Sequence, residues 1–222
     1  MPNDWDMRPA FLIQVRPGPP ASSITNDSTT AFPRSRHEPS LRCCRGRRQP
    51  AQGIPERKIA KAFAALAPTN LKLEIVEIGD LPLYNEELDA GTPPASYAAF
   101  RERIGRADAV LFVTPEYNRS VPGVLKNAID VGSRPYGKSA WNAKPCAVVS
   151  ASPGAIGGFG ANHHLRQSLV FLNMPVLQQP EAYLGGAGGF FDEAGKLSEK
   201  TQPFLQSIID AFAGWIEQNQ PR

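Results

Sequence analysis

Apolar side chains in the second part of the chain alternate between helical and strand-like spacing. Residues 57–67 carry them along one helix face, and Pro68 ends that helix. Residues 71–78 alternate apolar and polar positions as a strand does, whereas residues 107–113 form the continuous apolar run of a buried parallel strand. Similar signals predict strands at residues 144–151 and 175–184. They also predict four helices: one at residues 94–106, one that begins near Pro122, one that follows residue 160 and ends at Leu172, and one around residues 205–216.

This order of elements predicts an α/β fold built on a doubly wound parallel sheet. Ligands of such sheets bind beyond the carboxyl ends of the strands. The loops that follow the predicted strands are therefore the places where we expect a functional site. One of them, residues 80–89, follows the strand at residues 71–78.

A second loop, residues 114–120 (TPEYNRS), follows the apolar strand at residues 107–113. Pro115 sets a bend, Tyr117 offers a flat face, and the backbone amides of residues 116–118 are candidates for facing a ligand edge. The alternative interpretation is an ordinary proline-initiated turn in which Ser120 caps the next helix.

A third loop, residues 152–160 (SPGAIGGFG), follows the strand at residues 144–151 and contains four glycines in nine residues. Glycine lets the backbone approach a planar or anionic ligand closely. A flexible turn with no ligand has the same composition. Because the second and third loops follow successive strands, together they are candidates for framing one flat ligand.

The first 55 residues differ in composition from the rest of the chain. They hold nine of the 22 prolines and eight arginines against four acidic residues, and they contain no lysine. This composition predicts a disordered basic extension, with residues 10–15 as one short candidate strand. The arginines between Arg42 and Arg48 are an alternative phosphate-binding cluster, although the net charge of the whole chain is only +3.

Several conspicuous residues are expected to be structural. Adjacent side chains do not face each other on a helix, so His163 and His164 are assigned packing or surface roles rather than a metal site. Cys146 lies in an apolar run and is predicted to be a small core residue. Lys126 and Asp130 have the spacing of a pair on a helix surface.

Composition also limits the setting of the protein. The longest apolar runs have six or seven residues, which is too short to cross a bilayer. The start of the chain lacks the pattern of a signal peptide, and three cysteines cannot form a disulfide framework. We therefore expect a cytoplasmic protein with no membrane partner and no nucleic-acid partner.

The segment PEYNRSVPGVLKNAID at residues 115–130, with SPGAIGG at residues 152–158, resembles the NADPH-dependent FMN reductase family. That family includes flavodoxin-like quinone, azo-dye and chromate reductases. The segment DLPLYNEELD at residues 80–89 fits it too, and the resemblance extends from residue 57 to residue 195. It implies a flavodoxin-like three-layer αβα fold over residues 56–222.

The resemblance also implies a chemistry. FMN accepts a hydride from NAD(P)H, the nicotinamide leaves, and a small-molecule acceptor such as a quinone or free flavin then takes two electrons in the same place. No catalytic side chain and no metal are implied. A homodimer or homotetramer is implied, with the helix of Lys126 facing a partner subunit. The cofactor-binding residues that it implies are Pro115, Glu116, Tyr117, Asn118, Ser152, Gly154, Gly157 and Gly158.

The chain departs from the family before residue 57. The family begins with a buried first strand, which leads through a phosphate loop of the type GSLRxxSxN into a helix. Here LRCCRGRRQPAQGIPE at residues 41–56 precedes the helix, and Glu56 falls where the family has asparagine. The first strand is therefore predicted to be atypical or missing.

A local reading-frame slip would explain this departure. With permitted codons, the shifted frame of residues 48–56 encodes GSLRKESLN, and that of residues 42–47 encodes a run of valine and alanine. The alternative is a genuine extension over residues 1–55.

Three functions stay open from the sequence. The first is an FMN-dependent NAD(P)H oxidoreductase. The second is a flavodoxin-like domain with impaired flavin binding that acts only as an oligomeric scaffold. The third is a nucleic-acid binder that uses the arginine-rich segment. The sequence does not identify the electron acceptor, nor does it distinguish NADPH from NADH.

Overall fold

The computed structural model describes residues 11–17 and 55–219. Within them a five-stranded sheet has the strand order β2-β1-β3-β4-β5, which is the flavodoxin-like order. The strands are β1 (Phe11–Pro17), β2 (Leu71–Val76), β3 (Ala109–Pro115), β4 (Cys146–Ser152) and β5 (Ala182–Gly185).

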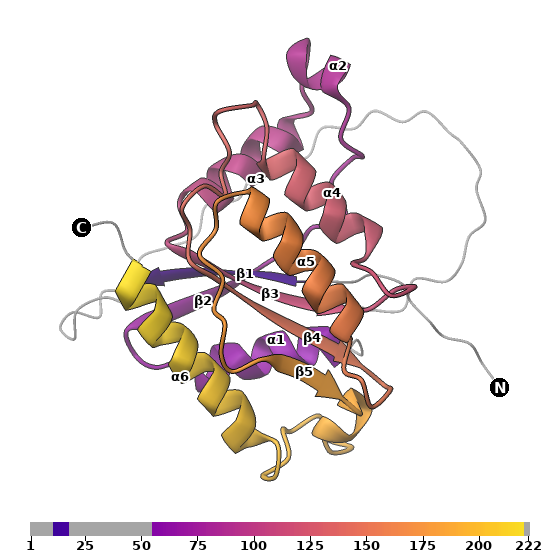
Figure 1. The fold of residues 1–222 in the computed structure, drawn as a ribbon, viewed down its shortest axis with the longest axis vertical. Helices are drawn as coiled ribbons and strands as arrows, with labels where there is room; N and C mark the ends of the chain where they lie inside the picture. Colours follow the sequence, from indigo (N-terminus) through magenta and orange to yellow (C-terminus); the bar gives the residue numbers. More distant parts are fainter. Residues whose placement is uncertain (1–10, 18–54, 220–222) are drawn as a thin grey trace.

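Helices cover both faces of this sheet (Figure 1). Helices α1 (Pro55–Leu66) and α6 (Gln202–Asn219) lie on one face, and α3 (Ala95–Gly105), α4 (Gly123–Gly132) and α5 (Phe159–Phe171) lie on the other. The short helix α2 (Glu86–Ala90) projects at one end, and a 3-10 helix, η2 (Ala187–Phe190), follows β5. The predicted three-layer α/β fold is confirmed.

Burial on both faces of the sheet explains why residues 109–113 of strand β3 are all apolar. All seven of its residues are buried. Leu111 and Val113 face the core layer beneath α1 and α6, whereas Val110 and Phe112 face the layer beneath α3, α4 and α5. Because helices cover both sides, no position of this strand is left for a polar side chain that faces water.

The first strand runs against its neighbours. Strand β1 pairs antiparallel with both β2 and β3, whereas β3, β4 and β5 pair in parallel. Pro17 lies opposite Leu71 and Phe11 lies opposite Val113, so β1 starts at the edge of the sheet where β3 ends. The sheet is therefore parallel except at β1, and the expectation of an atypical first strand is confirmed.

Strand β1 comes from the segment that composition assigned to the extension. Its Val15 side chain is 1% exposed and packs in the same core layer as α1. The arginine-rich cluster at residues 42–48 and the segment at residues 41–54 lie outside the described residues. None of the helices in the described part of the chain is long and apolar enough to span a membrane.

One predicted loop contains a helix. Residues 86–90 form α2, which begins after Asn85, whose side-chain oxygen accepts a hydrogen bond from the Leu88 N–H at 2.8 Å. The expectation of a loop throughout residues 80–89 is therefore wrong at its end. An asparagine followed by glutamates at 86 and 87 is an N-terminal helix signal in the sequence itself.

Candidate functional site

The two loops expected to frame a ligand leave the same edge of the sheet from neighbouring strands. Strands β3 and β4 are parallel, and Thr114 lies opposite Ser150 while Pro115 lies opposite Ala151. Pro115 is the buried last residue of β3, and Ser152 is the half-buried last residue of β4. The loops that follow them therefore begin side by side.

The loop after β3 closes into a tight turn. The Tyr117 N–H donates to the Ser120 carbonyl and the Ser120 N–H donates to the Tyr117 carbonyl, each at 2.9 Å. Asn118 and Arg119 between them have φ angles of 51° and 63°, in the left-handed region that hairpin-type turns use. The turn thus engages the amide of Tyr117, and the exposed Asn118 lies at its tip.

Ser120 does not cap helix α4. The residue that precedes α4 is Pro122, which offers no side-chain cap. The Ser120 hydroxyl instead lies 2.7 Å from Nδ1 of His164 on α5. The predicted cap is therefore wrong, because the turn places Ser120 against the neighbouring helix and not over the start of its own.

Glu116 ties the two loops together through its side chain. Its Oε2 accepts a hydrogen bond from the Ala161 N–H in the first turn of α5 at 3.0 Å, and its Oε1 lies 3.3 Å from Nη1 of Arg119. Helix α5 starts after Gly158, which has no side chain to cap it. A carboxylate at a helix N-terminus satisfies a free N–H and meets the positive end of the helix dipole.

Two glycines of the loop after β4 are required by packing within the protein. Gly157 has a φ of 66°, and a Cβ there would lie 2.5 Å from the carbonyl carbon of Tyr183 on β5. Gly158 has a φ of 77°, and its Cβ would lie 2.9 Å from Cβ of Ser150. Both are buried, whereas Gly154 is exposed and its Cβ would meet only open space and Ser152.

The two histidines of α5 and the cysteine of β4 contact other parts of the protein. Nε2 of His163 lies 2.8 Å from the Tyr183 hydroxyl, and burial is the main reason that the pKa of Tyr183 is raised to about 12. His163 and His164 thus contact different neighbours. Cys146 is fully buried, which confirms its predicted core position and raises the pKa of its thiol.

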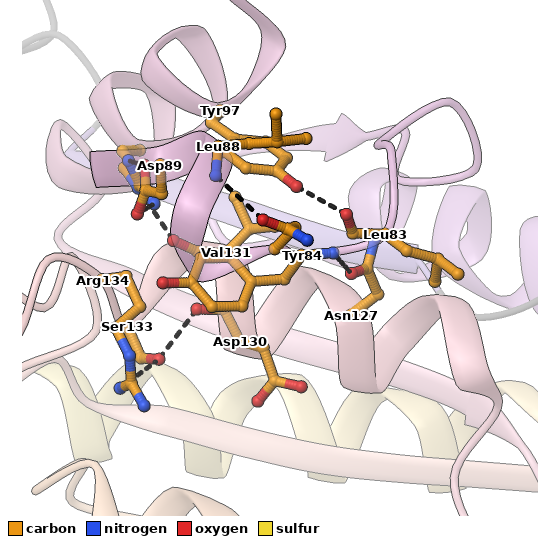
Figure 2. A network of polar contacts seen from close by, with 12 residues as sticks. Leu83, Tyr84, Leu88, Asp89, Tyr97, Asn127, Asp130, Val131, Ser133 and Arg134 are labelled. Carbon is orange, nitrogen blue, oxygen red and sulfur yellow. Dashed lines mark hydrogen bonds and ion pairs between the residues drawn. The ribbon is translucent and has the colours of Figure 1, made fainter. Parts of the chain in front are cut away.

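The loop at residues 80–89 is anchored to helix α4 by one buried side chain, which Figure 2 shows from close by. Oδ1 of Asn127 accepts from the Tyr84 N–H at 2.8 Å, and its Nδ2 donates to the Pro82 carbonyl at 2.9 Å and the Leu81 carbonyl at 3.2 Å. The Tyr97 hydroxyl donates to the Leu83 carbonyl at 2.7 Å.

An ion pair holds the end of the same loop. Arg101 donates to both carboxylate oxygens of Asp89, at 2.8 and 2.7 Å, and its Nε donates to the Val131 carbonyl at 2.8 Å. The two side chains are only 17% and 7% exposed. The hydrogen bonds from Arg101 lower the pKa of Asp89 below its usual range.

A shallow groove lies between α4 and α5, beside the loops and not between them. Its volume is about 410 Å³, and its lining includes Lys126, Ile129, His164 and Phe171. The Phe171 side chain is 82% exposed. The predicted pair of Lys126 and Asp130 is confirmed at its rim, with Nζ 2.7 Å from Oδ1. Among the described residues, no group of histidine, cysteine and acidic side chains is arranged to hold a metal ion.

Comparison with known proteins places this site in a family. The sequence model of the NADPH-dependent FMN reductases matches residues 53–189, which include both loops and the segment at residues 80–89. The chain belongs to the NADPH-dependent FMN reductase family. The resemblance of the sequence motifs is therefore confirmed, and the matched region begins within residues 41–56, the segment in which the chain was expected to depart from the family.

Curated relatives support the same assignment. A protein named quinone reductase from Pseudomonas putida is 68% identical over 164 residues, which cover 74% of this chain and 88% of that protein. A 2-hydroxy-1,4-benzoquinone reductase from a Burkholderia species is 44% identical over 161 residues, which cover 72% of this chain and 87% of that protein.

A solved structure agrees as well. FerB, a flavoenzyme NAD(P)H:(acceptor) oxidoreductase from Paracoccus denitrificans, superposes with a TM-score of 0.72 at 40% identity, and the match covers 78% of this chain and 95% of that one. The flavodoxin-like fold of the chain thus extends to a relative of known structure.

Proposed function

We propose that the protein is a flavin-dependent NAD(P)H oxidoreductase that reduces quinones. The observation that carries the proposal is the placement of the two loops of the family match side by side at the carboxyl edge of β3 and β4. The 68% identity with the quinone reductase of Pseudomonas putida supports the same acceptor class. A role as an oligomeric scaffold without flavin finds no comparable support.

FMN and NAD(P)H are the cofactors that the family implies. Bound flavin supplies hydride transfer between the nicotinamide and the acceptor, and the protein supplies binding and orientation. The two loops after β3 and β4 fit the flat ring system of a flavin. Asn118 and Gly154 are exposed there, at the carboxyl edge of the sheet where ligands of this fold bind. The segment before α1, where the family has its phosphate loop, lies outside the described residues.

The eight residues inferred from the family motif have different roles in this proposal. Glu116, Tyr117, Asn118, Ser152 and Gly154 are at least partly exposed, and we assign them to the flavin ring. Pro115, Gly157 and Gly158 are buried and shape the two loops.

Gly154 gives the sharpest test of this assignment. A methyl group at Gly154 makes only an ordinary contact with the Ser152 hydroxyl at 3.8 Å, and one at Gly188 in η2 meets open space. If the flavin lies against Gly154, the Gly154→Ala variant binds flavin and reduces quinone about tenfold less well, the effect of one misplaced methyl group in a fitted pocket. Gly188→Ala leaves both unchanged. Equal flavin affinity in the two variants would contradict the assignment.

An oligomer is the second part of the proposal. Val170 and Phe171 on α5 are 69% and 82% exposed beside the groove with α4, so the surface suits a second copy of the chain in a homodimer or homotetramer. We expect Phe171→Glu to lower the molar mass measured by light scattering. Phe204→Glu, on the opposite face at α6, serves as the control.

The start of the chain and its location complete the proposal. The family match begins at residue 53 and β1 is reversed, which supports a reading-frame slip in the segment before α1. Sequencing the gene tests this, since a stop codon in the shifted frame of residues 42–56 would refute it.

A supply of NAD(P)H and the free thiol of Cys146 are consistent with the cytoplasm.

A further inference from the structure

The turn after β3 has a backbone shape that one of its residues disfavours. Asn118 and Arg119 have φ angles of 51° and 63°. Turns with positive φ at both central positions favour asparagine followed by glycine, because a side chain at the second position crowds the backbone. Arginine at position 119 therefore strains the turn. A strained backbone keeps its shape where the surrounding structure holds it, and such strain gathers at functional sites.

One face of helix α5 lies directly against this turn. Gly160 and Ala161 precede His164 by four and three positions, so each shares a face of the helix with it. A Cβ at Gly160 would lie 2.9 Å from the carbonyl oxygen of Arg119. The absence of a side chain at position 160 thus lets the turn rest on the first turn of the helix.

Side-chain contacts fasten the turn to α5 on both sides of its strained residues. Before them, Oε2 of Glu116 accepts a hydrogen bond from the Ala161 N–H at 3.0 Å. After them, the Ser120 hydroxyl lies 2.7 Å from Nδ1 of His164. The neighbouring His163 contacts a different element, since its Nε2 lies 2.8 Å from the Tyr183 hydroxyl on β5.

We propose that His164 is a positioning residue for the flavin, which acts through Ser120 by holding the strained turn in shape before the flavin binds. The inference rests on the proposed function, because it needs the flavin ring at Tyr117 and Asn118. It adds to that function a residue of α5 outside both loops. Without His164 the turn relaxes in the free protein, and binding has to restore it, so the affinity for flavin falls.

Titrations of the full chain with FMN, followed by flavin fluorescence, test this role. His164→Ala should raise the dissociation constant about fivefold, which corresponds to about 1 kcal/mol, the net contribution of one hydrogen bond. Ser120→Ala removes the same hydrogen bond and should have the same effect. The double variant should lose no more than either single variant, because both lose one shared interaction. His164→Asn keeps a polar atom near the place of Nδ1 and should stay within about twofold of the unchanged chain.

His163→Ala is the matched control, because it removes the adjacent imidazole from the same helix. We expect it to change the dissociation constant by less than about twofold. Ser120→Ala also serves to exclude an effect through the oligomer, since His164 lines the groove between α4 and α5 and Ser120 does not.

Arg119→Gly tests whether strain in the turn is the cause. Glycine adopts a positive φ without the crowding of a side chain, so the turn keeps its shape without help from His164. In a chain that carries Arg119→Gly, His164→Ala should therefore raise the dissociation constant less than about twofold. This recovered affinity also shows that the variant is folded. A histidine that only stabilised the packing of α5 would cause the same loss with either residue at position 119.

The outcomes separate this inference from the proposed function. If the unchanged chain binds FMN and His164→Ala binds it equally well, the inference alone fails. It also fails if His163→Ala causes an equal loss, if the losses of Ser120→Ala and His164→Ala multiply in the double variant, or if Arg119→Gly brings no recovery. If the unchanged chain does not bind FMN, the proposed function fails and the inference fails with it.

Discussion

Replacing Glu116 by alanine should destabilise the protein by an amount set by the cap that this side chain forms on α5. The variant leaves the Ala161 N–H without its acceptor and removes a carboxylate from the positive end of the helix dipole. The Glu116 side chain is 13% exposed, so solvent replaces little of this interaction. We expect a loss of about 1.5 kcal/mol, the usual size of a charge-assisted hydrogen bond in such a place.

Urea denaturation followed by tryptophan fluorescence measures this loss. With a typical slope of about 2 kcal/mol per molar urea, the midpoint should fall by about 0.7 M at an unchanged slope. Glu116→Gln keeps an acceptor without the charge and should lose about half as much.

Arg119→Ala separates the cap from the ion pair. The Arg119 side chain is 71% exposed and its guanidinium lies 3.3 Å from Glu116. Its removal should cost less than about 0.5 kcal/mol, as exposed ion pairs do. A loss for Arg119→Ala as large as that for Glu116→Ala, or no loss for Glu116→Ala, would refute the reasoning.

Three further predictions concern the parts that hold the site in place. Asn127→Ala leaves the Tyr84 N–H and two carbonyls unpaired and should lower the free energy of unfolding by about 2 kcal/mol in urea denaturation, with a loss below about 0.5 kcal/mol as the contrary result. Because Arg101 lowers the pKa of Asp89, the stability that this carboxylate contributes is present above its unfolded pKa of about 4 and disappears as pH falls through the folded value. The stability difference between the unchanged chain and Asp89→Asn should therefore shrink in urea titrations as pH falls below about 4, and a constant difference would contradict this. The buried thiol of Cys146, whose pKa is raised, should escape alkylation by iodoacetamide in the native protein and react after denaturation, as mass spectrometry of its peptide would show, whereas native labelling would refute its burial.

Much of the fold could be predicted because the signals are local. The apolar run of β3 reports helices on both faces, and the helical spacing before Pro68 reports the single buried face of α1. The direction of β1 could not be predicted. Side chains alternate with the same period whichever way a strand runs, so residues 11–17 show a strand but not its orientation. The orientation depends on where the chain must go next.

The place of the candidate site could be predicted, but the roles of its side chains could not. A proline after an apolar strand and a glycine-rich segment after the next one identify the edge of the sheet. The cap that Glu116 places on α5 depends on a contact with Ala161, 45 residues further along the chain. Likewise, the sequence around Gly157 is that of a ligand-facing glycine loop, whereas in the structure the residue packs against Tyr183 of β5. Pairings between distant segments leave no periodic trace in a sequence.

The central claim is that the flavin bound to this chain carries electrons from NAD(P)H to a quinone. The most direct test is the visible absorbance of the flavin-loaded chain, freed of excess flavin by gel filtration and kept without oxygen. We predict that one equivalent of NADPH or NADH bleaches the flavin absorbance and that one equivalent of benzoquinone restores it. Loss of the flavin during gel filtration, or a retained flavin that neither nicotinamide bleaches, would contradict the claim.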